Sequence, residues 1–178
     1  NILNIERLVL FFFFFDYEQI FEVSLILKKD DFYLKAHQDI YQVMLALHDE
    51  GLPIDEDFIR NRVPKEDFND NVLIEILSAK PIVNTEAYCL EIKESSKLRK
   101  LEQLSKNIIF NVSNDKNSQD IITNIQVNIE NIENETHQIW CTSFKKHRIG
   151  YPAVVRYRDD CKVGEEWHVD GELHRLGG

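Results

Sequence analysis

Residues 4–135 contain one glycine and three prolines, and this scarcity constrains the fold more than any other feature of the chain. The four residues are Gly51, Pro53, Pro64 and Pro81, and each stands where the apolar spacing is interrupted. Between them, apolar residues recur at three- and four-residue steps, which is the spacing of one face of an α-helix. Turns and hairpins of β proteins use glycine and proline far more often. The sequence therefore predicts an all-α fold for this range.

Composition limits the partners and the location of the protein. Of 178 residues, 43% are apolar, which suffices for a hydrophobic core. Acidic residues outnumber basic ones by 31 to 21, so strong direct binding to DNA is not expected.

The longest apolar run, residues 8–15, is far shorter than the roughly 20 residues of a membrane-spanning helix, and no membrane association is expected. The cysteines, Cys89, Cys141 and Cys161, form no close pair, which favours a reducing cytoplasm.

Five shorter helices are expected in the first part of the chain. Asn4 or a nearby residue is expected to cap the first, Asp16 the second and Asp55 the fourth, because these side chains accept hydrogen bonds from unpaired helix amides. Gly51 is expected to end the third helix. In order, the expected helices cover residues 4–15, a segment that carries residues 20–26, residues 34–49, residues 55–62 and residues 65–78.

Two long helices are expected after residue 84. Thr85 opens the first, which is predicted to reach Val112, and the polar residues 114–117 interrupt it. Isoleucines at three- and four-residue steps continue the helical pattern to about residue 135, so the two helices form an αα-hairpin. Six residues are expected to close this hairpin or to form an oligomer interface: Leu101, Leu104, Ile108, Ile122, Ile125 and Ile129.

The composition changes near residue 136, where glycine, proline and aromatic residues return. Two β-like runs, residues 153–157 and 165–169, follow, and the pair Asp170-Gly171 is typical of a two-residue hairpin turn. A pattern of aromatic, basic and glycine residues also recurs 27 positions later, since Trp140, His147, Arg148 and Gly150 are matched by Trp167, His174, Arg175 and Gly177. We therefore predict three regions: a helical bundle over 1–110, a hairpin over 85–135 and a β-hairpin repeat tail over 137–178, which indicates a fusion or a truncation.

Several short segments occur in an order that resembles one known family, the N-terminal domain of DnaB-type replicative helicases. They lie between residues 4 and 88, and the helical hairpin extends the resemblance to about residue 135. The segments are Asn4-Ile5-Glu6-Arg7-Leu8-Val9-Leu10, Asp31-Phe32-Tyr33, Ala36-His37-Gln38-Asp39-Ile40-Tyr41, Gly51-Leu52-Pro53-Ile54-Asp55 and Asn84-Thr85-Glu86-Ala87-Tyr88.

The resemblance implies a role without chemistry in this chain. Domains of this family are helical bundles with a protruding hairpin, and paired hairpins assemble six chains into a collar of three dimers that receives the C-terminal domain of primase. ATP and Mg²⁺ bind a separate motor domain, whose phosphate loop pattern G-x-x-x-x-G-K-[ST] does not occur in this sequence. No cofactor and no enzymatic activity are expected here. The alternative is a stand-alone interaction protein in which the β tail is the binding module.

One segment departs from the family pattern, because five consecutive phenylalanines occupy residues 11–15. Five consecutive rings on one helix point in every direction around it. If the whole run stayed helical with the usual packing, each badly placed ring would cost about 1 to 3 kcal/mol of overpacking. Altered local packing is therefore expected at this point of the chain.

No residue pattern indicates a metal or a catalytic site. His37 and His48 are eleven positions apart, whereas ligands on one helix prefer a spacing of three or four. The acidic residues around Asp55 fit helix caps and solvated faces, and Cys89 fits a buried thiol. Structural roles are therefore expected for all of them.

Overall fold

The computed structural model describes residues 1–66, 68–81, 84–114, 116–141, 154–158, 161–169 and 172–174, with side-chain environments as far as residue 135. The chain forms two compact units, residues 1–101 and 102–178. The elements in order are α1 (Ile2–Phe12), α2 (Gln19–Ser24), the 3-10 helix η1 (Lys29–Asp31), α3 (Lys35–Asp49), α4 (Glu56–Arg62), α5 (Asp70–Leu77), α6 (Thr85–Ser113), α7 (Ser118–Cys141), β1 (Val154–Arg158), β2 (Cys161–Val169) and β3 (Glu172–His174). The all-α prediction for the first 135 residues is confirmed.

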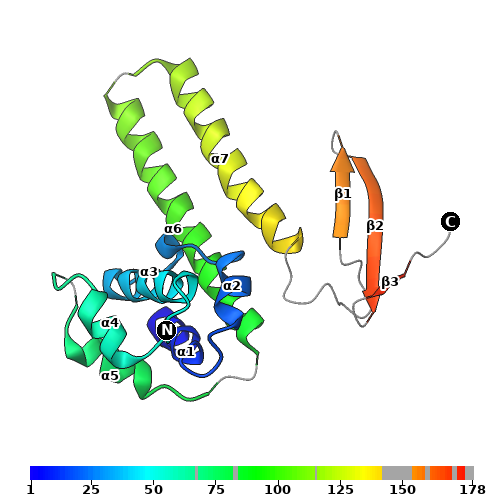
Figure 1. The fold of residues 1–178 in the computed structure, drawn as a ribbon. Coiled ribbons are helices and arrows are strands. Elements are labelled where there is room, and N and C mark those ends of the chain that lie inside the picture. The colour runs from blue at the N-terminus through cyan, green and yellow to red at the C-terminus, as the bar shows by residue number, and fades with distance from the viewer. Residues whose placement is uncertain are drawn as a thin grey trace. The chain divides into compact units, whose positions relative to one another are not determined.

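The first unit is a helical bundle built around α3 (Figure 1). Helix α3 packs against α1, α2, η1 and α4, and α1 also packs against α5. The inward stripe of α3 holds Ile40, Met44 and Leu47, all fully buried, at the predicted steps of four and three residues. The ring of Tyr41 lies beside this stripe, 4.8 Å from the ring of Phe32, and its hydroxyl donates to the carbonyl of Leu27 at 3.0 Å. Burial raises the pKa of Tyr41 well above its usual range, so the hydroxyl stays protonated.

Gly51 ends α3 as the sequence predicts. Its φ of 69° lies in the left-handed region, which residues with a Cβ adopt only at a cost. The amide of Gly51 donates to the carbonyl of His48 at 3.0 Å, and the amide of Leu52 donates to that of Leu47 at 2.9 Å. This pair of bonds is the Schellman motif, which satisfies carbonyls that the helix leaves unpaired.

The helix starts agree with the sequence only in part. Asp55 caps α4 as expected, since its side chain accepts from the amide of Phe58. Asn1, three residues before Asn4, caps α1. Asp16 does not cap α2, which begins after Glu18 without a side-chain cap. Helix α5 was expected from residue 65 but begins at Asp70, because the side chain of Asn69 accepts from the amide of Val72 and fixes the start there.

The phenylalanine run is accommodated because α1 ends at Phe12. Phe13 then turns inward and is fully buried, with its ring 6.2 Å from that of Tyr41, while Phe15 is 69% exposed. The ring of Phe15 packs edge-on against that of Phe11 at 4.8 Å. Breaking the helix inside the run distributes the rings between the core and the surface, so the expected overpacking of one continuous helix does not arise.

Two buried polar clusters fix the bundle. The carboxylate of Glu6 on α1 is fully buried and accepts from the backbone amide of Tyr33 and from Nδ1 of His37 at 2.7 Å. The carboxylate of Asp31 is also fully buried and accepts from Nζ of Lys93 at 2.9 Å and from the hydroxyl of Ser96 at 2.7 Å. Both lysine and serine lie on α6, so Asp31 ties η1 to the first half of the long helix.

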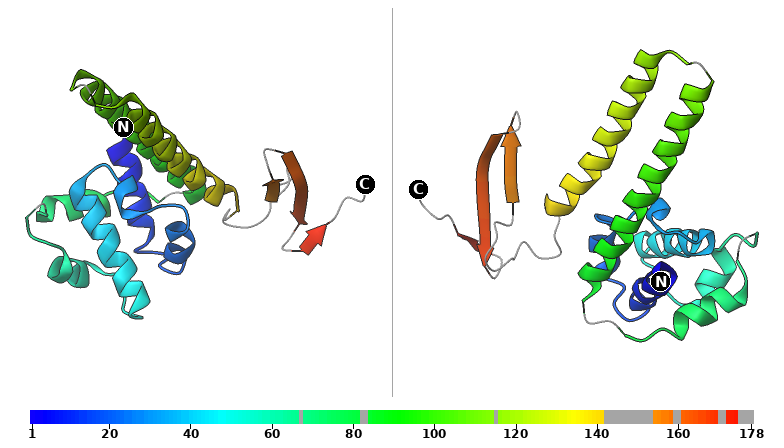
Figure 2. Two further views of the ribbon diagram at one scale, coloured as in Figure 1. Left: turned by 90° about the horizontal axis from the view of Figure 1, so that it is seen from above. Right: turned by 180° about the vertical axis from the view of Figure 1, so that it is seen from behind.

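The second unit contains the end of α6, helix α7 and three short strands. Helix α7 runs antiparallel to the end of α6, as an αα-hairpin (Figures 1 and 2). The connection at residues 114–117 is where the polar cluster predicts it, although Asp115 lies outside the described residues. Helix α7 continues to Cys141, beyond the expected end near residue 135.

The strands pair in the order β1-β2-β3, each antiparallel to the next. Arg158 pairs with Cys161, and Val169 pairs with Glu172, so the connection between β2 and β3 has the two-residue length that Asp170-Gly171 predicts. The turn residues Asp170 and Gly171 lie outside the described residues, as do the side chains of the proposed repeat. The predicted boundaries near residues 110 and 136 stay predictions. Within the described part of the chain, no helix is long and apolar enough to cross a membrane.

Candidate functional site

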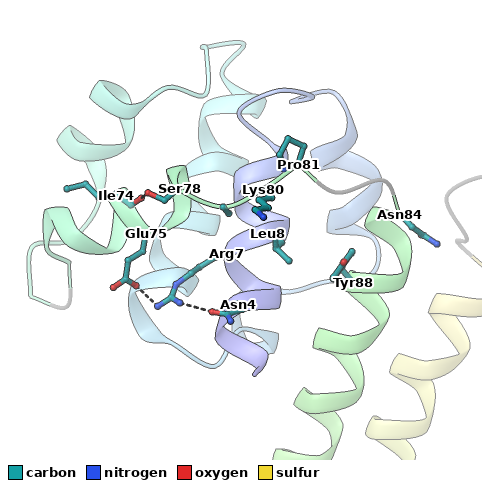
Figure 3. A pocket seen from close by; sticks show the side chains of 11 residues that line it. Asn4, Arg7, Leu8, Ile74, Glu75, Ser78, Lys80, Pro81, Asn84 and Tyr88 are labelled. Carbon is teal, nitrogen blue, oxygen red and sulfur yellow. Dashed lines mark hydrogen bonds and ion pairs between the residues drawn. The ribbon is translucent and has the colours of Figure 1, made fainter.

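A pocket of about 810 Å³ opens between α1, α5 and the start of α6, entirely within the first unit (Figure 3). Helix α1 contributes polar and apolar side chains to one wall, α5 and the residues after it form a second wall, and α6 contributes an aromatic ring. The lining residues are Asn4, Arg7, Leu8, Ile74, Glu75, Ser78, Ala79, Lys80, Pro81, Asn84 and Tyr88.

Arg7 holds two of these walls together. Its guanidinium forms an ion pair with Glu75 of α5 and donates to the side-chain oxygen of Asn4 at 2.9 Å (Figure 3). Glu75 is half exposed, so the ion pair contributes less than about 1 kcal/mol to stability. Its main effect is geometric, because it fixes the separation of α1 and α5 and leaves Leu8 on the pocket surface.

Two further polar groups of the pocket, on Lys80 and Tyr88, are available for a ligand. Among the described residues, neither Nζ of Lys80 nor the hydroxyl of Tyr88 has a hydrogen-bond or ion-pair partner. Asn84 is occupied, because its side-chain oxygen accepts from the amide of Ala87 and caps α6. The pocket thus offers apolar surface at Leu8 and Pro81 beside one cation and one hydroxyl. This mixture suits a side chain or short segment of another protein.

The described residues hold no cluster suited to binding a metal ion. No group of three or more histidine, cysteine or acidic side chains lies close enough to hold a metal ion in this part of the chain. Cys89 is fully buried, and burial raises the pKa of its thiol above the usual range, so the nucleophilic thiolate is disfavoured. His37 is committed to Glu6 within the core. These residues have the structural roles that their sequence context favours.

The six hairpin residues chosen from the sequence fall into two groups. Leu104 is buried at 7% exposure, and Ile108 and Ile125 are half-buried. Leu101, Ile122 and Ile129 are between 41% and 47% exposed. The first group lies on the least exposed stripe of each helix, which continues through residues that the sequence analysis did not select: Asn111, Ile121, Asn128 and Ile132.

Two residues of the exposed group, Ile122 and Ile129, belong to an apolar face of the hairpin. Ile109 follows Ile108 by one residue, and Ile122 follows Ile121 by one residue. In an antiparallel helix pair, the residues that directly follow the least exposed stripe of each helix lie on the same side of the pair. We call this side the hairpin face and define it by four residues that are at least 41% exposed: Ile109, Val112, Ile122 and Ile129.

Sequence reasoning missed the pocket, because its walls come from segments some 70 residues apart. One signal was present: Arg7 interrupts the apolar first helix and Glu75 lies on a helix with few other charges. A charge on an otherwise apolar helix needs a partner or solvent, and here each charge supplies the other's partner. Pairing the two charges in advance requires knowing that α1 packs against α5.

A helical bundle with an open pocket and an apolar hairpin face is typical of domains that act through protein contacts. Residues 1–94 match the family described as the DnaB-like helicase N terminal domain. The chain therefore belongs to this family, as the resemblance of its ordered segments predicts.

Individual relatives agree with this assignment. Over 106 residues, 59% of this chain, the sequence is 41% identical to the replicative DNA helicase DnaB of Helicobacter pylori strain J99. Over 84 residues, 44% of this chain, it is 36% identical to the replicative DNA helicase DnaC of Bacillus subtilis strain 168. These matches span only 22% and 18% of the two helicases, so the chain corresponds to about a fifth of their length.

Solved structures show the same fold. One is the N-terminal domain of DnaB helicase from Helicobacter pylori, described together with its interactions with primase, at a TM-score of 0.61 and 39% identity. The match covers 63% of this chain and 92% of that one. The N-terminal domain of DnaB helicase from Mycobacterium tuberculosis matches with a TM-score of 0.63 over 72% of this chain and 96% of that one. At 22% identity, the second match shows the fold alone.

Proposed function

We propose that this domain is the non-catalytic collar of a replicative DNA helicase, which assembles into dimers and hexamers and receives primase. The observation that carries the proposal is the hairpin face, formed by exposed aliphatic residues on two antiparallel helices. Family membership of residues 1–94 supports the helicase context. ATP hydrolysis and DNA translocation belong, in this proposal, to a motor domain outside this chain, and the collar requires no cofactor. A cytoplasmic location is part of the same proposal.

Self-association follows from the chemistry of the hairpin face. Four isoleucine and valine side chains in contact with water are unfavourable, and burying them against a like surface removes this cost. Two hairpins that pair through the same face form four antiparallel helices around an apolar centre, a stable packing arrangement. Such a contact is isologous and produces a dimer. A hexamer then requires a second kind of contact between dimers.

Primase docking is assigned to the pocket between α1, α5 and α6. The related domain from Helicobacter pylori is described with its interactions with primase, and that protein is 39% identical to this one. The pocket supports the assignment because Lys80 and Tyr88 present an ammonium and a hydroxyl beside the apolar surface of Leu8. A primase segment with an apolar side chain next to a carboxylate satisfies both kinds of group.

Titration calorimetry with a purified primase C-terminal domain tests the assignment. Tyr88→Ala and Lys80→Glu each remove or reverse one polar group of the pocket, and we expect each to weaken binding about tenfold or more, as interface anchors do. Lys116→Glu, in the exposed turn between α6 and α7, makes the same charge change elsewhere and should bind like the parent. If all three variants bind alike, the pocket is not the docking site. If the parent chain does not bind primase, the proposed partner is wrong.

A further inference from the structure

A second apolar surface lies on α2 and on the turn residues at its two ends, away from the pocket. Tyr17, Phe21 and Leu25 are 53%, 58% and 42% exposed and follow one another at steps of four, so they line one side of the helical segment. We call these three residues the α2 stripe. It extends over about 12 Å, at 1.5 Å per residue. The exposed area is roughly 300 Å², the size at which an apolar patch on a soluble protein is often functional.

One edge of the α2 stripe is acidic. Glu18 and Glu22 lie one residue after Tyr17 and Phe21, which turns both carboxylates to the same flank. Neither makes an ion pair with any residue that the structure describes. Glu18 is the N-cap residue of α2 and Glu22 lies within the helix, so the two carboxylates are four residues apart, and a like-charge pair at this spacing is unfavourable. A cation placed between the two carboxylates would relieve this repulsion.

Two candidate occupants of the stripe do not fit these charges and areas. A second copy of the chain would bring the same carboxylate edge near its own, in a protein of net charge −10. The stripe is also smaller than the roughly 800 Å² that each partner of a stable dimer buries. An anionic membrane surface would repel Glu18 and Glu22.

We propose that the α2 stripe docks a basic amphipathic helix of a partner protein. Apolar side chains on one side of that helix pack between Tyr17, Phe21 and Leu25, in the way amphipathic helices bind apolar surfaces. Lysine or arginine on the adjacent flank pairs with Glu18 and Glu22. Lys28 and Lys29, three and four positions after Leu25, are the basic residues nearest the stripe in sequence, so the partner's basic residues belong at the opposite end, which meets the two glutamates. This surface does not depend on the primase pocket or on the hairpin face.

Two synthetic peptides test the proposal with the full chain. Both are about four turns long with the same leucine face, and the other positions are lysine in one and glutamate in the other. Calorimetry at physiological ionic strength should detect binding of the lysine peptide only. Tyr17→Ser with Phe21→Ser should weaken that binding about tenfold. Glu18→Gln with Glu22→Gln should weaken binding of the lysine peptide several-fold. The difference in affinity between this variant and the parent should shrink as the salt concentration rises.

Matched controls separate the stripe from the general negative field of the protein. Val127→Ser and Glu133→Gln change an exposed apolar group and an exposed carboxylate on α7, and both variants should bind like the parent. Equal weakening by the control and stripe variants, equal binding of both peptides, or no binding at all would each overturn the proposal. Light scattering tests the remaining alternative. A lower mass for the Tyr17→Ser, Phe21→Ser variant than for the parent would show that a second copy of the chain binds the stripe.

Discussion

Nζ of Lys93 on α6 lies 2.9 Å from Oδ2 of Asp31, and both side chains are buried. Asp31 also accepts from the hydroxyl of Ser96 and from the backbone amide of Lys28. The carboxylate thus closes the turn that begins η1 and binds two residues of the long helix. Because α6 continues into the hairpin, Asp31 fixes the half of α6 that belongs to the bundle.

Asp31→Ala should therefore destabilise the bundle by about 3 kcal/mol, since it breaks a buried ion pair and leaves several donors without this acceptor. Urea unfolding followed by circular dichroism measures the change. Glu102→Ala provides the control, because its pair with Lys106 is 65% exposed on both sides and should contribute little to stability. A loss for Asp31→Ala no larger than that for Glu102→Ala would contradict the assigned role.

The stability of the bundle should depend on pH through Asp39. Burial raises the pKa of this carboxyl, but hydrogen bonds and charge from Lys35 and Lys29 outweigh burial and hold the pKa below the ordinary 3.8. A lowered pKa in the folded state gives stability that is present above the ordinary value and is lost as pH falls through the folded one. The lysines are exposed, so the gain is at most about 1 kcal/mol.

Comparison of Asp39→Asn with the parent checks this expectation. The difference in free energy of unfolding should be full at pH 6 and should decrease at pH values below about 4. Asp49→Asn, on an exposed carboxylate at the end of α3, should show a smaller difference at pH 6. A difference for Asp39→Asn that stayed constant over the whole range would mean that the variant acts through packing.

The phenylalanine run predicts opposite outcomes for two neighbouring substitutions. Phe13→Ala removes a fully buried ring and should cost about 3 to 5 kcal/mol, because it leaves a cavity beside Tyr41. Phe15→Ala removes a ring that is largely exposed and packs edge-on against Phe11, so it should cost less than about 1 kcal/mol. Thermal unfolding of both variants distinguishes them, and equal losses would mean that the chain does not turn at Phe12.

Local patterns predicted most of the helices because the responsible interactions are local. Gly51 ends α3 through its own backbone geometry, and Asp55 caps α4 three residues ahead. The start of α5 was misplaced, because Asn69 competes with earlier polar residues for the cap and spacing does not rank them. In each case, the deciding contact lies within one helical turn.

Long-range pairs could not be predicted in the same way. Arg7 pairs with Glu75, 68 residues further along the chain. Glu6 pairs with His37, 31 residues further along. Nothing in either segment selects its partner before the helices pack. The six-residue hairpin set was chosen on three- and four-residue spacing alone, and this spacing fits two adjacent stripes of α7 equally well. Ile121 and Ile122 differ by one residue, yet only Ile122 is more than 40% exposed.

The difference in exposure between the hairpin face and the least exposed stripe of the hairpin gives a prediction for assembly. Ile122→Asp with Ile129→Asp places two carboxylates on the hairpin face, where they stay hydrated in the monomer and oppose each other when two faces meet. We expect a folded protein with unchanged helicity that no longer self-associates. Light scattering measures the mass, and circular dichroism measures the helicity.

Leu104→Asp and Ile125→Asp are the matched changes at a buried and a half-buried residue of the least exposed stripe. A carboxylate on the buried stripe either ionises and opens the hairpin or stays protonated with a raised pKa, and both outcomes weaken helix packing. These variants should therefore lose helicity in the hairpin together with self-association, while the bundle of residues 1–101 stays folded. If the Ile122→Asp, Ile129→Asp variant assembled like the parent while Leu104→Asp did not, the hairpin would be needed for assembly but its exposed face would not be the contact. If all these variants assembled like the parent, the hairpin would have no part in oligomerisation.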